Sequence, residues 1–93
     1  MDKSFFDGAL ADIQSAVDKQ YYPDEPVTPE ARLDLMANVI RPLYNFHKRG
    51  KFSEEQFQQL LDRFNSIITE KGFTGVKVED LSGQEVGGKE KLV

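Results

Sequence analysis

Residues 53–72, SEEQFQQLLDRFNSIITEKG, are the clearest structural signal in this 93-residue chain. Ser53 and Gln56 have the spacing of a capping box, in which each side chain satisfies a backbone N–H group at the start of a helix. Gly72 can adopt the left-handed conformation that often ends one. Between them, large apolar residues recur every three or four positions, at Phe57, Leu60, Leu61, Phe64, Ile67 and Ile68. The stretch predicts an amphipathic helix whose apolar face needs other helices to cover it.

The same helical spacing occurs twice before residue 53. Residues 5–20 predict one helix, with an apolar stripe at Phe6, Leu10, Ile13 and Val17 that is widened by Phe5, Ala9 and Ala16. Thr28 and Gly50 are placed to begin and end another helix. Its apolar arc is wide and consists of Leu33, Met36, Ile40, Leu43 and Phe46, flanked by Leu35, Val39 and Tyr44. Three prolines between residues 23 and 29 predict an extended connection between these two helices.

Three helices without a paired strand pattern indicate an all-α fold, a small three-helix antiparallel bundle. The second helix should be kinked near Pro42, because proline lacks an N–H group and clashes with the carbonyl four residues earlier. We assign residues 1–75 to the helical bundle domain. We assign residues 76–93 to a short extended or flexible C-terminal segment, because they hold three glycines and no partner for a strand.

The composition excludes several classes of protein. There is no cysteine, so neither a disulfide framework nor a thiolate metal site is available. No apolar run is long enough to predict a membrane span, and no secretory signal is apparent, so we expect a cytoplasmic protein.

Charge is distributed unevenly along the chain, which has a net charge of −4. Residues 1–28 carry six acidic and two basic residues, whereas residues 29–51 carry two acidic and five basic ones. The basic segment includes Arg41, Lys48, Arg49 and Lys51, which are candidates for contact with phosphate or with an acidic partner. The simpler interpretation is that they are solvated charges near the C-terminal end of a helix. Because the whole chain is acidic, we expect no general affinity for nucleic acid.

No arrangement of residues predicts catalysis. His47 is the single histidine, and no strained turn presents a serine that it could activate. One histidine without cysteine also argues against a zinc site. We therefore expect no catalytic residue, no metal and no cofactor.

Aromatic residues are numerous, and a thin core does not hide all of them. Tyr21 and Tyr22 lie beside the proline-rich connection and are candidates for recognition of a partner, since tyrosine supplies contact area at low entropy cost. An alternative of equal weight is that these rings fold over the end of the bundle.

Three short motifs carry a resemblance to a known family: Asn38-Val39-Ile40-Arg41, Phe52-Ser53-Glu54 and Gly72-Phe73-Thr74-Gly75. With the polar residues around Lys77, they make residues 33–82 resemble the C-terminal half of the immunity proteins of pediocin-like (class IIa) bacteriocins. The resemblance implies a cytosolic antiparallel helical bundle that recognises a peptide-bound membrane receptor. It also implies that the last helix and the C-terminal segment carry specificity, which points to Phe73 and Lys77. The acidic charge and Pro42 depart from that family's pattern.

The sequence therefore favours a non-enzymatic protein-binding module that occupies a surface of its partner, as an immunity protein or inhibitor does. The candidate contact residues are Tyr21, Tyr22, Arg41, Lys48, Arg49, Lys51, Phe73 and Lys77. The alternative is a structural or assembly subunit that self-associates through the wide apolar face around Leu35, Val39 and Tyr44.

Overall fold

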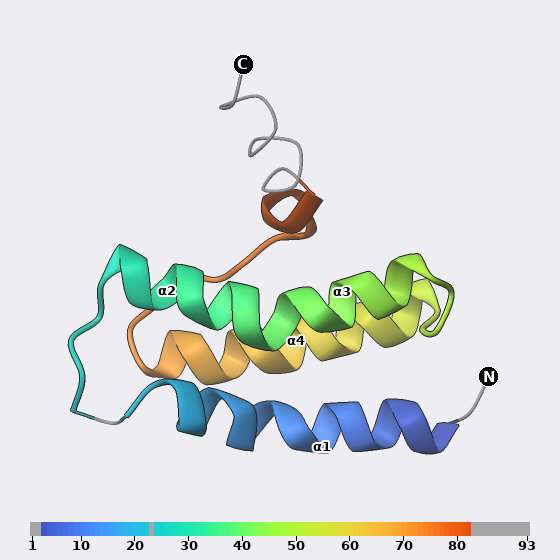
Figure 1. Cartoon of the computed structure of the whole chain (residues 1–93), viewed down its shortest axis with the longest axis horizontal. Coiled ribbons are helices and arrows are strands. Elements are labelled where there is room, and N and C mark those ends of the chain that lie inside the picture. The colour runs from blue at the N-terminus through green and yellow to red at the C-terminus, as the bar shows by residue number, and fades with distance from the viewer. Residues whose placement is uncertain (1–2, 23, 83–93) are drawn as a thin grey trace.

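Helix α4 (Glu54–Glu70) packs against the first helix of the chain and against the helix that precedes Gly50. The computed structural model describes residues 3–22 and 24–82. Helix α1 (Lys3–Gln20) and a helical rod both lie along α4, and α1 also contacts the rod. The rod runs in the direction opposite to α1 and α4 (Figure 1). The rod consists of α2 (Pro29–Leu35), the π-helix η1 (Met36–Ile40) and α3 (Arg41–Lys48). The prediction of a small all-α antiparallel bundle is confirmed.

The predicted ends of the second and third helices are also confirmed, whereas the first helix begins at Lys3 and not at residue 5. The Thr28 hydroxyl accepts a hydrogen bond from the Ala31 N–H at 3.1 Å, which caps α2. Ser53 and Gln56 form both hydrogen bonds of the capping box at the start of α4. Gly50 and Gly72 have positive φ angles of 86° and 108°, so each turns the chain after a helix as only glycine does readily.

Pro42 explains the π-helix in the middle of the rod. A proline at this position has no N–H group to donate to the carbonyl of Asn38, four residues earlier. The N–H group of Arg41 instead donates to the carbonyl of Met36, five residues back, which is the hydrogen bond of a π-helical turn. The expected distortion near residues 38–42 is therefore a widened turn, and the rod remains helical on both sides of it.

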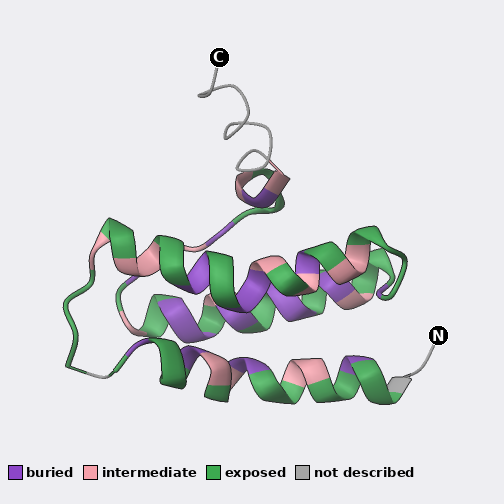
Figure 2. Cartoon of the chain, viewed as in Figure 1, coloured by how far each residue is buried: buried purple, intermediate pink, exposed green. Residues whose placement is uncertain are grey.

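The widened turn also corrects the predicted apolar face of the rod. Helical spacing predicts Leu33 in the core, but its side chain is 48% exposed. The buried residues of the rod are Leu35, Met36, Val39, Ile40 and Tyr44. Tyr44 is buried in place of the predicted Leu43, because a π-helical turn holds more residues than an α-helical turn and shifts the face that follows it. Figure 2 shows the buried residues gathered along the middle of the rod and along α4.

The core extends beyond the predicted end of the bundle. Val76 and Leu81 are 2% and 0% exposed, and residues 78–82 form a helical turn. The Asn65 side chain donates to the Val76 carbonyl at 2.8 Å and accepts from the Val76 N–H at 2.7 Å, which fixes the extended chain against α4. The expected boundary at residue 75 therefore falls inside packed structure. Residues 83–93 of the predicted C-terminal segment lie outside the described residues.

Candidate functional site

Two of the predicted contact residues belong to the core. Tyr21 and Phe73 are each 4% exposed, and their rings meet edge to face with centroids 4.9 Å apart. The Tyr21 hydroxyl donates to the carbonyl of Glu25, so the polar end of the ring is satisfied locally. The assignment of these two residues to a partner surface is corrected. For Tyr21, the alternative of a ring folded over the end of the bundle is the one observed.

The remaining predicted contact residues do not form one surface. Tyr22 is 61% exposed at the end of α1, whereas Lys48, Arg49 and Lys51 are exposed at the opposite end of the bundle (Figure 1). Lys77 is exposed next to the helical turn of residues 78–82.

Arg41 stands apart from the other basic residues of its segment. It is half-buried, and its guanidinium donates to the carbonyl of Leu81 at 3.3 Å. This hydrogen bond ties α3 to the C-terminal turn. Arg41 therefore has a structural role that its place in a basic segment did not predict.

His47 also has a structural role. Its ring stacks on Phe57 with centroids 4.9 Å apart, and Nδ1 lies 2.9 Å from the carbonyl oxygen of Phe52. Because a carbonyl only accepts hydrogen bonds, this contact places a proton on Nδ1. Within the described part of the chain, no group of three or more histidine, aspartate or glutamate residues is arranged to hold a metal ion.

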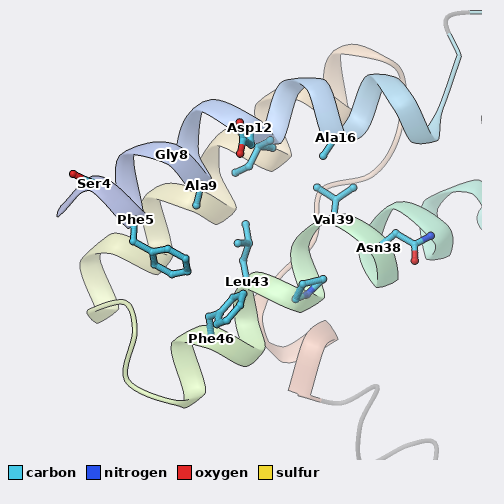
Figure 3. A pocket seen from close by; sticks show the side chains of 12 residues that line it. Ser4, Phe5, Gly8, Ala9, Asp12, Ala16, Asn38, Val39, Leu43 and Phe46 are labelled. Atoms are coloured by element: carbon cyan, nitrogen blue, oxygen red, sulfur yellow. The ribbon is translucent and has the colours of Figure 1, made fainter. Parts of the chain in front are cut away.

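An apolar groove separates α1 from the rod at η1 and α3 (Figure 3). We call it the α1–α3 groove; its volume is about 380 Å³. The side chains of Phe5, Leu43 and Phe46 project into the space between the two walls in Figure 3. The groove is lined by Ser4, Phe5, Gly8, Ala9, Asp12, Ile13, Ala16, Asn38, Val39, Pro42, Leu43 and Phe46.

The walls of the groove have the spacing of helix-packing faces. The α1 wall presents residues 5, 9, 12 and 16, and the opposite wall presents residues 39, 43 and 46. These intervals of four and three residues are those of a helix stripe that packs against another helix. On α1 the stripe lies beside the buried stripe of Phe6, Ile13 and Val17. Helix α1 therefore has one face covered by the core and a second, neighbouring face that is open.

Small side chains keep this second face open. Ala9 and Ala16 fill little volume, and a Cβ atom added at Gly8 would meet no atom within 4 Å. At one end, Phe5 contacts Phe46 edge to face, with centroids 5.4 Å apart.

The other end of the groove is crossed by a hydrogen bond from the Asn38 amide to Gln20, at 3.2 Å. The groove is therefore bounded along its length by α1 and the rod, and both of its ends are fixed by side-chain contacts.

Among the described residues that line the groove, Asp12 is the one that carries a charge. Its carboxylate has no ion pair and no side-chain hydrogen bond with any other described residue. Asp18 of the same helix, in contrast, pairs with Lys71 at 3.7 Å. The groove thus combines apolar walls with a single carboxylate.

A second depression lies where α2 begins, near Val27, Leu33 and Thr74, with a volume of about 550 Å³. It is larger, but connecting segments form much of its wall. Its charged residue, Arg32, donates hydrogen bonds to the carbonyls of Thr74 and Gly75. The α1–α3 groove is the better candidate site, because its two walls are helical and its carboxylate is not engaged in the fold.

None of the predicted contact residues lines the α1–α3 groove. The signal that points to it in the sequence is the apolar group of Phe5, Ala9 and Ala16 beside the main stripe of residues 5–20. The spacing of these three residues predicts only that the buried face of the helix is wider. A stripe that meets the core and a stripe that is open to a partner have the same spacing, so the sequence alone does not separate them.

None of the helices in the described residues is both long and apolar enough to cross a membrane. Comparisons of the chain with protein-family models, with curated proteins and with solved structures give no match.

Proposed function

We propose that this protein is a non-enzymatic binding module that holds a helical segment of a partner protein in the α1–α3 groove. It acts by occupying a surface of that partner, in the manner of an immunity or inhibitor-type protein. The observation that carries the proposal is the second stripe of α1, which is apolar except at Asp12 and faces Val39 and Leu43 across an open space. At one end this stripe contacts Phe46 through Phe5. Recognition of an amphipathic helix in an apolar groove is a recurring way for helical proteins to bind.

The dimensions of the groove favour a helix as its occupant. Phe5 and Ala16 are eleven residues apart on α1, which corresponds to about 16 Å along a helix axis, or roughly three turns. A partner helix of that length presents apolar residues at the same intervals of three and four as the two walls. An extended strand has no unpaired sheet edge to join in the described residues, because they contain no strand.

Filling the groove tests this proposal. The probe is a fluorescein-labelled amphipathic peptide of about 14 residues, with leucine at helical spacing and glutamine elsewhere. We expect weak binding, on the order of 100 µM, because one short helix face buries little area. Ala9→Leu should place a larger side chain in the groove and weaken binding by about tenfold or more, which corresponds to about 1.4 kcal/mol.

Ala11→Leu is the matched control, because Ala11 is exposed on the same helix and does not line the groove. It should leave peptide affinity within about twofold of the unmodified protein, a change of about 0.4 kcal/mol. Fluorescence anisotropy measures both variants. No binding of the peptide, or equal loss of affinity in the two variants, would contradict the proposal.

Self-association through the apolar face of the rod has less support. Leu35 and Tyr44 are at most 7% exposed, because the same chain covers them, and Val39, at 6% exposed, is reached from the α1–α3 groove. A second copy that occupied the α1–α3 groove instead would appear as a dimer in sedimentation equilibrium, and Ala9→Leu would dissociate it. Binding of nucleic acid has no favouring observation, since Glu54 and Glu55 lie close after the exposed basic residues.

A further inference from the structure

We infer that the helix bound in the α1–α3 groove is cationic, with a lysine or arginine placed among its apolar residues so that it meets Asp12. This inference rests on the proposed function and specifies the chemistry of the partner. It starts from the position of Asp12 in the stripe formed by residues 5, 9, 12 and 16. The other three positions are apolar, so one site on an otherwise apolar wall is charged.

The surroundings of Asp12 give its carboxylate no partner within the described chain. The hydroxyl of Ser15 donates to the backbone carbonyl of Asp12 and not to its carboxylate. Across the groove, the residues that face α1 are Asn38, Val39, Pro42, Leu43 and Phe46, none of which is charged. Solvent therefore hydrates the carboxylate while the groove is open.

Binding of a helix changes the hydration of the Asp12 carboxylate. A partner that covers the groove removes water from the carboxylate, and a buried charge without a partner is strongly unfavourable. A lysine or arginine restores the lost interaction with a charge-assisted hydrogen bond. An acidic helix, or the carboxylate head of a fatty acid, instead adds repulsion between like charges. Asp12 thus selects between ligands that the apolar walls alone would accept.

The charge on the α1 side of the groove acts in the same direction. Residues 1–28, which include α1, carry six acidic and two basic residues, and the whole chain has a net charge of −4. The opposite wall belongs to residues 29–51, which carry two acidic and five basic residues. Attraction of a cationic ligand therefore comes from the α1 side and from the net charge of the chain, which raise the encounter rate with ligands of opposite charge. Attraction by the net charge of the chain does not depend on Asp12 alone. The test must therefore separate this general attraction from a direct contact with the Asp12 carboxylate.

The experiment uses three peptides with identical leucine spacing that differ at one position, which is lysine, glutamine or glutamate. We expect the lysine peptide to bind about fivefold tighter than the glutamine peptide and the glutamate peptide to bind more weakly than both. Asp12→Asn should reduce the preference for lysine to within about twofold. Asp12→Ser is a second variant with the same expected result, and it also removes the amide that could form new hydrogen bonds.

Asp62→Asn is the control, because it changes the net charge by the same amount on an exposed part of α4. Asp62 accepts a hydrogen bond from Gln58 at 2.9 Å, and asparagine keeps an acceptor for that contact. The control should retain the preference for the lysine peptide. Loss of the preference in both Asp12→Asn and Asp62→Asn would show that only general charge acts, and it would overturn the inference.

Equal affinity for the three peptides, with Ala9→Leu still weakening all of them, would also overturn the inference while leaving the proposed function intact. Absence of binding by every peptide would overturn the proposed function itself. The two failures are therefore distinguishable in one set of titrations.

Discussion

Arg32 connects the start of the helical rod to the segment after α4. Its Nε–H donates to the Thr74 carbonyl at 2.9 Å and its Nη2–H donates to the Gly75 carbonyl at 2.8 Å. The same Nη2 lies 3.7 Å from an Asp80 carboxylate oxygen, and the Arg32 side chain is 25% exposed. The guanidinium thus fixes two consecutive backbone carbonyls and the C-terminal turn together.

We expect Arg32→Ala to lower the free energy of unfolding by about 1–2 kcal/mol, because two charge-assisted hydrogen bonds are lost from a partly shielded position. Arg32→Lys should lose most of this amount, since a lysine ammonium cannot reproduce the planar fork that reaches both carbonyls. Urea unfolding followed by circular dichroism measures both variants. A loss below about 0.5 kcal/mol in Arg32→Ala would contradict the role given to this side chain.

Arg32 and Asn65 also show why parts of the structure escaped prediction at the residue scale. Each binds backbone atoms of a segment distant in sequence, at Thr74, Gly75 and Val76. Every residue has a backbone carbonyl, so such a contact leaves no pattern of residue types in the sequence. Asp12 is different, because a charged residue beside an apolar stripe is visible in the sequence. Its position in a groove, however, is known only once the structure shows the opposite wall.

At the scale of the elements, the glycines Gly8 and Gly72 have opposite roles. Gly72 ends α4 with a φ angle of 108°, and the N–H of the next residue, Phe73, donates to the Ile68 carbonyl at 3.0 Å. Gly8 lies inside α1, where a Cβ atom would meet no neighbour within 4 Å. Glycine is therefore required at one position and merely tolerated at the other.

We expect Gly72→Ala to lower the free energy of unfolding by about 1 kcal/mol or more, because alanine is strained at this φ angle. An added Cβ atom there would lie in ordinary contact with a Val27 methyl carbon, at 3.4 Å, so the cost comes from the backbone conformation. Gly8→Ala should raise the free energy of unfolding by up to about 1 kcal/mol, because alanine has the higher helix propensity. The midpoint of thermal unfolding should fall for Gly72→Ala and rise for Gly8→Ala. A change in the same direction for both variants would contradict the roles given to the two glycines.

Helices were more predictable from the sequence than the chain after α4. The start of α2 and both ends of α4 were predictable, because capping residues act within one helical turn. The prediction of which residues of the rod are buried was partly wrong. Pro42 was expected to distort the helix, but the sequence did not indicate that a π-helical turn would change which residues face the core. Val76 and Leu81 are five residues apart, a spacing that fits neither a strand nor a helix, so their burial left no periodic signal.

At the scale of the whole molecule, the bundle is completed by the chain after α4. Phe73, Val76 and Leu81 are each at most 4% exposed and join the same core cluster as the helices. Burial of each such side chain contributes about 1.5–3 kcal/mol, which together is a large share of the stability of a small domain.

Two truncations test where the folded unit ends. A chain that stops at Gly72 loses these three side chains and should show a strongly lowered midpoint of thermal unfolding or no cooperative transition. A chain that stops at Ser82 retains them and should unfold within a few degrees of the full chain. Circular dichroism melts decide between the two. Equal stability of both truncated chains would show that the core does not depend on residues 73–82.

The function proposed for the molecule depends on a helix-sized apolar groove between α1 and the rod that a partner helix fills. Mapping of ¹H–¹⁵N chemical-shift changes, as the leucine-containing peptide is added to the full chain, tests this directly. We expect the largest changes on the groove residues Phe5, Ala9, Asp12, Leu43 and Phe46, and we expect Ala9→Leu to suppress them. Changes concentrated instead at Tyr22, or around Lys48 and Lys51, or no changes at all, would contradict the proposal.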